Sequence, residues 1–251
     1  MTILLTNDDG IFAEGIMTLA KIVQGMGDIY VVAPSRQRSA ASHGITVYEP
    51  LVVKEVEYPV LVKKAYSVSG KPADCVKVAL EDLVDVKPDI ILSGINAGCN
   101  FGIDVLYSGT VSAAMEGMLY GIPSFALSLD GINFDICNQY LKSLIERLMK
   151  HDIGEKNLWN INIPSCELSE YKGNAYAALS GHTQFPYRFK KFQVNNDEWY
   201  YFPKSEAVGA LEENSDVDMV KKGYIAVTLL TVNLEDKESI AGIIGDELNG
   251  D

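Results

Sequence analysis

The chain has 251 residues, of which 47% are hydrophobic, and a formal net charge of −13. This length suffices for one large α/β unit, and the acidic balance argues against a nucleic-acid polymer as the main partner, because such proteins carry a basic face. No apolar stretch approaches the roughly 20 residues that span a bilayer, no secretory signal pattern opens the chain, and four scattered cysteines fit reduced thiols. We therefore expect a cytoplasmic protein with no membrane partner.

Strand and helix signals alternate through the first half of the chain. Residues 2–6 form an apolar run that ends in a turn, 13–26 carry apolar residues at helical spacing, and 28–33 form a second apolar run, which together predict a βαβ unit. The same alternation continues with edge strands around 46–56, a helix at 72–83, a strand at 89–93, a helix at 111–120, a strand at 124–129, a helix at 138–149 and a strand at 158–163. The pattern predicts an α/β fold with a Rossmann-like, mostly parallel sheet and flanking helices.

The second half of the chain is less regular. Residues 183–203 are rich in aromatic side chains around a turn at Asn195, which predicts a hairpin or protruding arm whose aromatics pack on the core or on a second subunit rather than on a base. A strand is expected at 223–232, and the acidic tail is a candidate final helix. We expect one domain, with an α/β core at 1–163 and a hairpin and C-terminal arm at 164–251.

Two adjacent carboxylates, Asp8 and Asp9, follow the first predicted strand. The carboxyl end of a parallel strand is where open α/β sheets bind ligands. Two neighbouring acids repel each other unless a cation or a proton intervenes, so a hard metal ion is the natural partner. The alternative is an Asx-type turn that caps the next helix, which needs only one of the two acids.

A second candidate feature follows the strand at 89–93. A glycine-rich loop at 94–102 leads to Ser108, Gly109 and Thr110 at the start of a predicted helix. A helix amino terminus carries an effective charge of about +0.5 and binds phosphate through free N–H groups, and a glycine there lets an anion approach the backbone. The alternative is an ordinary serine or threonine N-cap.

These stretches resemble the SurE family of 5′-nucleotidases, metal-dependent phosphatases that act on nucleoside monophosphates. The resemblance is carried, in family order, by 4–10, 33–46, 69–76, 93–111 and 223–228. The chain departs from the family pattern at Ala40, Lys71 and Leu229.

The resemblance implies a ligand set for one Mg²⁺ or Mn²⁺ ion per subunit and a set of residues near the substrate phosphate. All the donors would be oxygen atoms, which suits these hard cations. His43 lies in the matched loop, but we expect a hydrogen-bonded loop histidine rather than a ligand. The implied metal ligands are Asp8, Asp9, Ser39 and Asn96, of which Asp8 and Asp9 are also the implied catalytic residues, and the implied phosphate-binding residues are Asn96, Ser108, Gly109 and Thr110.

The activity implied is hydrolysis of nucleoside 5′-monophosphates to nucleoside and phosphate, with 3′-nucleotides and short polyphosphate as further candidate substrates. The family also implies a homodimer or tetramer in which the C-terminal arm is exchanged between subunits. Two alternatives belong to other classes: a receiver-like signalling module that binds Mg²⁺, and a haloacid-dehalogenase-like phosphatase with an aspartyl nucleophile. The first lacks a suitable phosphoacceptor aspartate and lysine, and the second needs a DxD pattern where this chain has Asp8 next to Asp9.

Overall fold

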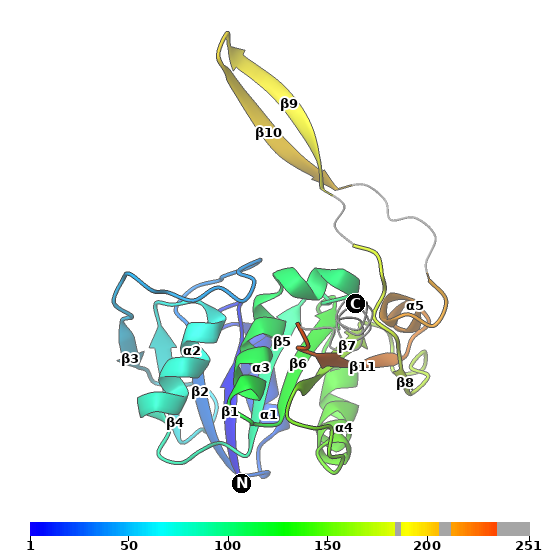
Figure 1. The fold of residues 1–251 in the computed structure, drawn as a ribbon. Coiled ribbons are helices and arrows are strands. Elements are labelled where there is room, and N and C mark those ends of the chain that lie inside the picture. The colour runs from blue at the N-terminus through cyan, green and yellow to red at the C-terminus, as the bar shows by residue number, and fades with distance from the viewer. Residues whose placement is uncertain (184–186, 206–211, 235–251) are drawn as a thin grey trace, which may run out of the picture.

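The computed structural model describes residues 1–183, 187–205 and 212–234. Within them a nine-stranded sheet has the strand order β3-β4-β2-β1-β5-β6-β7-β11-β8, and a separate two-stranded hairpin stands apart from it (Figure 1). The sheet strands are β1 (Thr2–Thr6), β2 (Asp28–Pro34), β3 (Val53–Glu55), β4 (Lys64–Val68), β5 (Ile90–Ala97), β6 (Ser124–Asp130), β7 (Asn157–Pro164), β8 (Asn174–Tyr176) and β11 (Ile225–Thr231).

Helices cover both faces of the sheet, because its central strands are apolar on both sides. Strand β1 shows how this works: Ile3 and Leu5 belong to the core cluster under α1 and α4, whereas Leu4 belongs to the cluster under α2 and α3. The helical segments are α1 (Glu14–Ile22), α2 (Pro72–Val78), η1 (Ala79–Leu83), η2 (Gly102–Tyr107), α3 (Gly109–Leu119), η3 (Cys137–Leu141), α4 (Lys142–Leu148) and α5 (Asp216–Lys221). None of these helices has the length and apolar character that a membrane span requires.

The mostly parallel α/β fold expected from the sequence is confirmed. Strands β4, β2, β1, β5, β6 and β7 pair in parallel in that order. The helix expected at 72–83 is α2 continued by the wider turns of η1, and the one expected at 138–149 is η3 continued by α4. Among the elements not predicted from the sequence are β4, β8 and α5. They have between three and six residues each, and β4 (KAYSV) lacks an apolar run like that of β1 (TILLT).

The chain reverses its direction of travel across the sheet at β1. It runs from β1 outward to β2 and β4, and then returns to place β5 on the other side of β1, followed by β6 and β7. Such a switch point leaves a crevice at the carboxyl ends of the two strands it separates. Asp8 and Asp9 follow β1 and Asn96 lies near the end of β5, so the fold brings them to one place.

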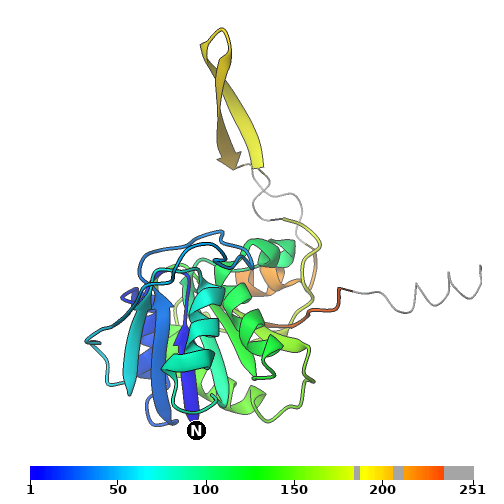
Figure 2. The same cartoon turned by 60° about the vertical axis from the view of Figure 1, so that its left-hand side comes forward.

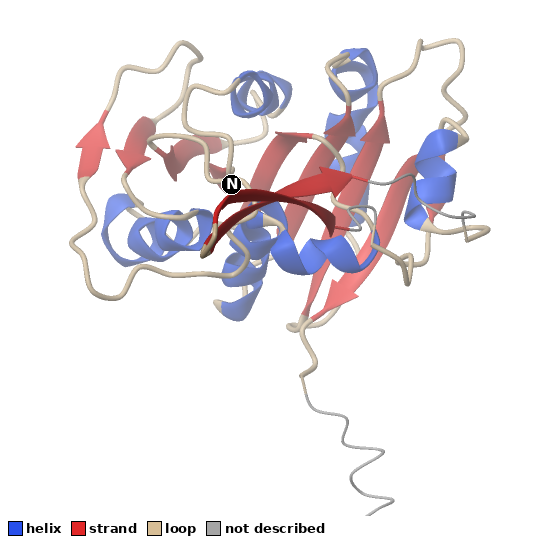
Figure 3. Ribbon diagram, turned by 90° about the horizontal axis from the view of Figure 1, so that it is seen from above, coloured by secondary structure: helices blue, strands red, loops and turns tan. Residues whose placement is uncertain are grey.

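The hairpin pairs β9 (Tyr187–Asn195) with β10 (Glu198–Ser205) and extends away from the body on the side of the carboxyl edge (Figures 2 and 3). This confirms the predicted protruding hairpin. Six of its aromatic side chains are exposed and so do not pack on the core of this chain: Phe189, Phe192, Trp199, Tyr200, Tyr201 and Phe202. The predicted final helix falls within 235–251, outside the described residues.

Candidate active site

A pocket of about 320 Å³ opens at the carboxyl edge of the sheet, at the switch point between β1 and β5. All four residues named from the sequence as metal ligands line it. Ser108, from the phosphate-binding set, lines it as well, whereas Gly109 and Thr110 occupy the next two positions of α3 and are not among its lining residues. The lining ligands are Asp8, Asp9, Ser39 and Asn96.

The Asp8 carboxylate is hydrogen-bonded to the first turn of α3. Its side chain is buried, and the Thr110 hydroxyl donates a hydrogen bond of 2.5 Å to its Oδ1 atom. Burial raises the pKa of Asp8 to about 6; the hydrogen bond from Thr110 lowers the pKa, and the neighbouring charge of Asp9 raises it. The hydrogen bond thus compensates the ionised form only in part, and a cation in the pocket would add to that compensation.

Asp9 connects the turn after β1 to two other parts of the pocket wall. Its Oδ1 atom accepts a hydrogen bond of 3.1 Å from the Gln37 side chain, and its Oδ2 atom accepts one of 3.2 Å from the Ala97 backbone N–H. The amide nitrogen of Asn96 donates to the Gly98 carbonyl at 2.6 Å, so this side chain presents its oxygen as the remaining donor for a cation.

The turn after β1 is formed by Asn7 rather than by either acid. Its side chain exchanges two hydrogen bonds with the backbone of Gly10, of 2.9 and 3.2 Å. Helix α1 begins after Ala13 without any side-chain cap. The alternative in which Asp8 or Asp9 caps this helix is therefore wrong, and both carboxylates remain available to the pocket.

The amino terminus of α3 combines a cap with a close approach of the backbone to Asp8. The Ser108 hydroxyl accepts the Val111 N–H at 3.0 Å, which confirms the N-cap reading for Ser108. A Cβ atom on Gly109 would lie 2.8 Å from Cβ and 3.0 Å from Oδ2 of Asp8, so only glycine fits here. Because the Thr110 hydroxyl is engaged by Asp8, Thr110 can offer an anion its backbone N–H but not its side chain.

The loop that carries Ser39 has no regular secondary structure, and its backbone is tied to neighbouring elements. The Arg38 N–H donates to the Asp8 carbonyl at 2.7 Å. Ser42 donates from its N–H to the Tyr107 carbonyl at 3.1 Å and from its hydroxyl to the Leu106 carbonyl at 2.7 Å. Ser39 therefore lies on a segment that is anchored on both sides.

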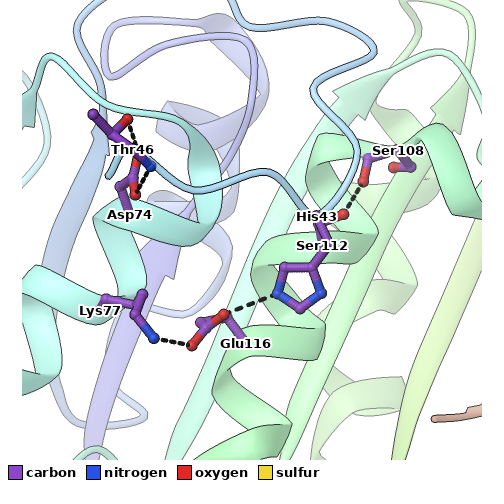
Figure 4. Close-up of polar contacts among 7 residues, drawn as sticks. All are labelled: His43, Thr46, Asp74, Lys77, Ser108, Ser112 and Glu116. Carbon is purple, nitrogen blue, oxygen red and sulfur yellow. Dashed lines mark hydrogen bonds and ion pairs between the residues drawn. The ribbon is translucent and has the colours of Figure 1, made fainter. Parts of the chain in front are cut away.

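Further along, the same loop is fixed to α2 and α3 by buried carboxylates (Figure 4). Glu116 of α3 pairs with His43 at 2.8 Å and with Lys77 of α2 at 3.0 Å, while Asp74 of α2 accepts two hydrogen bonds from Thr46, of 2.8 and 2.6 Å. Burial raises the pKa of Glu116, but the hydrogen bonds from His43 and Lys77 outweigh it and hold this pKa below its usual value. His43 is a bonded loop histidine, as expected.

Among the pocket residues that sequence reasoning missed are Gln37 and Asp104. Gln37 donates a hydrogen bond to Asp9, and Asp104 accepts one of 2.5 Å from the Thr183 hydroxyl. The only signal for Gln37 is its position two residues before Ser39. Within the described part of the chain no three His, Cys, Asp or Glu side chains gather as a metal-binding group, so a cation here depends on the hydroxyl and amide oxygens too.

A family model, sequence relatives and a solved structure all indicate the same family. The family model described as "Survival protein SurE" matches residues 3–185. Proteins named 5′-nucleotidase SurE are similar to the chain in Clostridium botulinum, strain ATCC 19397, at 43% identity over 93% of this chain and 94% of the relative, and in Caldanaerobacter subterraneus at 40% identity over 95% and 94%. The crystal structure of the SurE protein from Aquifex aeolicus superposes with a TM-score of 0.85 at 34% identity, covering 98% of this chain and all of the other.

The mostly parallel sheet and the acidic pocket at its switch point define an α/β protein with a candidate ligand site at the carboxyl edge. The chain belongs to the SurE family.

Proposed function

We propose that this chain is a 5′-nucleotidase that hydrolyses nucleoside 5′-monophosphates with the help of one divalent cation. The relatives at 40 to 43% identity over nearly the whole chain carry that name. The observation that supports the site is the convergence of two acids, a hydroxyl and an amide in one pocket beside the amino terminus of α3. Free nucleotide is the substrate class, in keeping with the acidic chain, and 3′-nucleotides and short polyphosphate are further candidates.

The donor set fits Mg²⁺ or Mn²⁺. Asp8, Asp9, Ser39 and Asn96 offer oxygen atoms only, which these cations prefer over the nitrogen and sulfur ligands of Zn²⁺. Burial raises the pKa of Asp8, which supports a positively charged partner for its ionised form. When bound, the cation would stabilise charge on the phosphate and lower the pKa of a coordinated water molecule.

The chain itself would bind and orient the phosphate. The first N–H groups of α3, at Gly109 and Thr110, have no acceptor within the helix and carry its positive dipole end, so they suit phosphate oxygens. Asp8 is positioned by Thr110 and Asp9 by Gln37 and Ala97, which keeps both carboxylates in place without substrate. Water attacks phosphorus, the bond to the nucleoside oxygen breaks, and that oxygen takes up a proton.

Asp9→Asn tests the metal site. It removes one ligand charge while the shape is kept, so we expect Mn²⁺ affinity, measured by calorimetry, and phosphate release from AMP each to fall at least a hundredfold, with the unfolding temperature nearly unchanged. The matched control is Asp197→Asn at the turn between β9 and β10, in the hairpin that stands apart from the sheet (Figure 1). An Asp9→Asn protein with normal Mn²⁺ binding and turnover would remove Asp9 from the site.

Acid-quench trapping distinguishes this reaction from that of an aspartyl-phosphate phosphatase. Direct attack by water leaves no phosphoenzyme, whereas a haloacid-dehalogenase-like enzyme or a receiver module would retain labelled phosphate on an aspartate. We expect no label on the quenched protein.

The exposed hairpin supports a proposal about assembly. Its aromatic side chains are uncovered in the single chain, and a second subunit is the partner that the family resemblance suggests for the hairpin and C-terminal arm within 164–251. We expect light scattering to give the mass of a homodimer or tetramer. We also expect the protein to be located in the cytoplasm.

A further inference from the structure

Alternate residues of the loop after β2 line two different pockets. Gln37 and Ser39 line the candidate active site, whereas Arg36 and Arg38 line a second pocket of about 350 Å³, which we call the basic pocket. Its other walls are the stretch Thr46–Leu51 and the turn Ser69–Lys71 before α2. The two pockets therefore share a loop but present different side chains to solvent.

The basic pocket has an unusual charge for this protein. Arg36, Arg38 and Lys71 contribute three cations against a single acid, Glu49, in a chain whose formal net charge is −13. Among the ion pairs of the described residues, none includes any of these three cations. No ion pair of the described residues therefore neutralises these three cations.

The three cations also keep hydrogen-bond donors available. Lys71 donates from Nζ to the Ile45 carbonyl at 3.2 Å, and one Nη atom of Arg38 donates to the Ser69 carbonyl. The Nε atom of Arg38 is buried and has no partner in the described structure, and the Arg36 side chain has no hydrogen bond there either. The burial cost applies to Nε of Arg38 alone, because Arg36 is exposed; its free guanidinium donors suit an oxyanion with several acceptor atoms.

We propose that the basic pocket is an anion site that binds a phosphate group, either as free phosphate or on a nucleotide. Two guanidinium groups and one ammonium group would meet the phosphate oxygens with charge-assisted hydrogen bonds. The site needs none of the oxygen donors around Asp8 and Asp9, so it would bind without a divalent cation. This inference does not depend on the proposed nucleotidase activity.

Calorimetric titration of the full chain in EDTA tests the proposal. The probes are inorganic phosphate and AMP, which distinguish free phosphate from a nucleotide phosphate. The variant Arg36→Ala with Lys71→Ala removes two cations of the pocket, and Lys190→Ala with Lys191→Ala removes two from the hairpin as a matched control. We expect at least tenfold weaker phosphate binding in the first variant, no change in the second, and weaker binding with added salt.

A crystal soaked in tungstate, a heavier analogue of phosphate, locates the anion directly. Anomalous density beside Arg36 and Arg38 would support the proposal. Equal phosphate affinity in the two double variants, an absence of metal-free binding to the unaltered chain, or tungstate only beside α3 would each overturn it. Thermal unfolding of both variants shows that they are folded, and if Arg36→Ala with Lys71→Ala is not, Arg36→Gln alone replaces it.

Discussion

Helix α3 contains two glycines whose replacement by alanine would have different consequences, and the contrast tests the geometry of the site. On Gly109 the new Cβ atom would lie 2.8 Å from Cβ of Asp8, and an ordinary contact begins at 3.4 Å, so Asp8 or the helix must move by about 0.6 Å. Metal–oxygen distances tolerate only about 0.2 Å. We therefore expect Gly109→Ala to weaken Mn²⁺ binding at least tenfold and to slow phosphate release.

The matched control is Gly117→Ala, which lies two turns further along α3. There the Cβ atom would lie 2.4 Å from Cδ1 of Ile91 and 2.6 Å from Oγ of Ser124, so the strain falls on the core. Overpacking of this kind costs about 1–3 kcal/mol, partly offset by the higher helix propensity of alanine, which amounts to about 1 kcal/mol. We expect a lower unfolding temperature with Mn²⁺ affinity close to that of the unaltered chain. If Gly109→Ala bound Mn²⁺ normally, or if both variants lost it equally, the close approach of α3 to Asp8 would not control the site.

Three further predictions concern the groups that hold the pocket. Thr110→Val removes the hydrogen bond that lowers the pKa of Asp8, so we expect weaker Mn²⁺ binding by calorimetry, restored in Thr110→Ser; equal affinity in all three proteins would contradict this role. His43→Ala removes one charge-assisted hydrogen bond to buried Glu116. We expect the free energy of unfolding, measured in urea, to fall by about 1.5–3 kcal/mol, with the ion pair between Lys77 and Glu116 keeping the loss toward the lower value. Because the pKa of Glu116 is lowered in the fold, its stabilisation is present above the unfolded value of about 4.3 and is lost as the pH falls through the folded value. The stability difference between the unaltered chain and Glu116→Gln should therefore shrink as the pH falls below about 4, and a difference independent of pH would refute this.

The parts of the fold that could be predicted from sequence are those whose signal is local. Strand β1 and helix α1 follow from hydrophobic period within a dozen residues, and the position of Asp8 and Asp9 follows from their place after a strand. Strand β8 and helix α5 could not be predicted, because such short elements are specified by their contacts with β11, which β8 pairs with and α5 packs on, rather than by their own pattern.

The contacts that shape the site were hidden for a different reason. Gln37 bonds Asp9 across 28 positions and His43 bonds Glu116 across 73, and no periodicity links residues so far apart. Thr110 illustrates the limit most clearly. Its place at a helix start was visible, but the choice between contacting an anion and holding Asp8 depends on how close α3 comes to β1.

Helix α3 contacts both sides of the pocket. Its first turn contacts Asp8 through Thr110, and its last turn contacts the Ser39 loop through the hydrogen bond between Glu116 and His43. Two of the proposed cation ligands, Asp8 and Ser39, thus depend on the position of one helix, although they lie 31 positions apart in the chain. A displacement of α3 would change both ligands together, so substitutions at its contacts should couple. We expect Thr110→Val combined with His43→Ala to lower Mn²⁺ affinity by a factor that differs from the product of the two single effects. Strictly multiplicative effects would show that the helix does not link the two sides of the pocket.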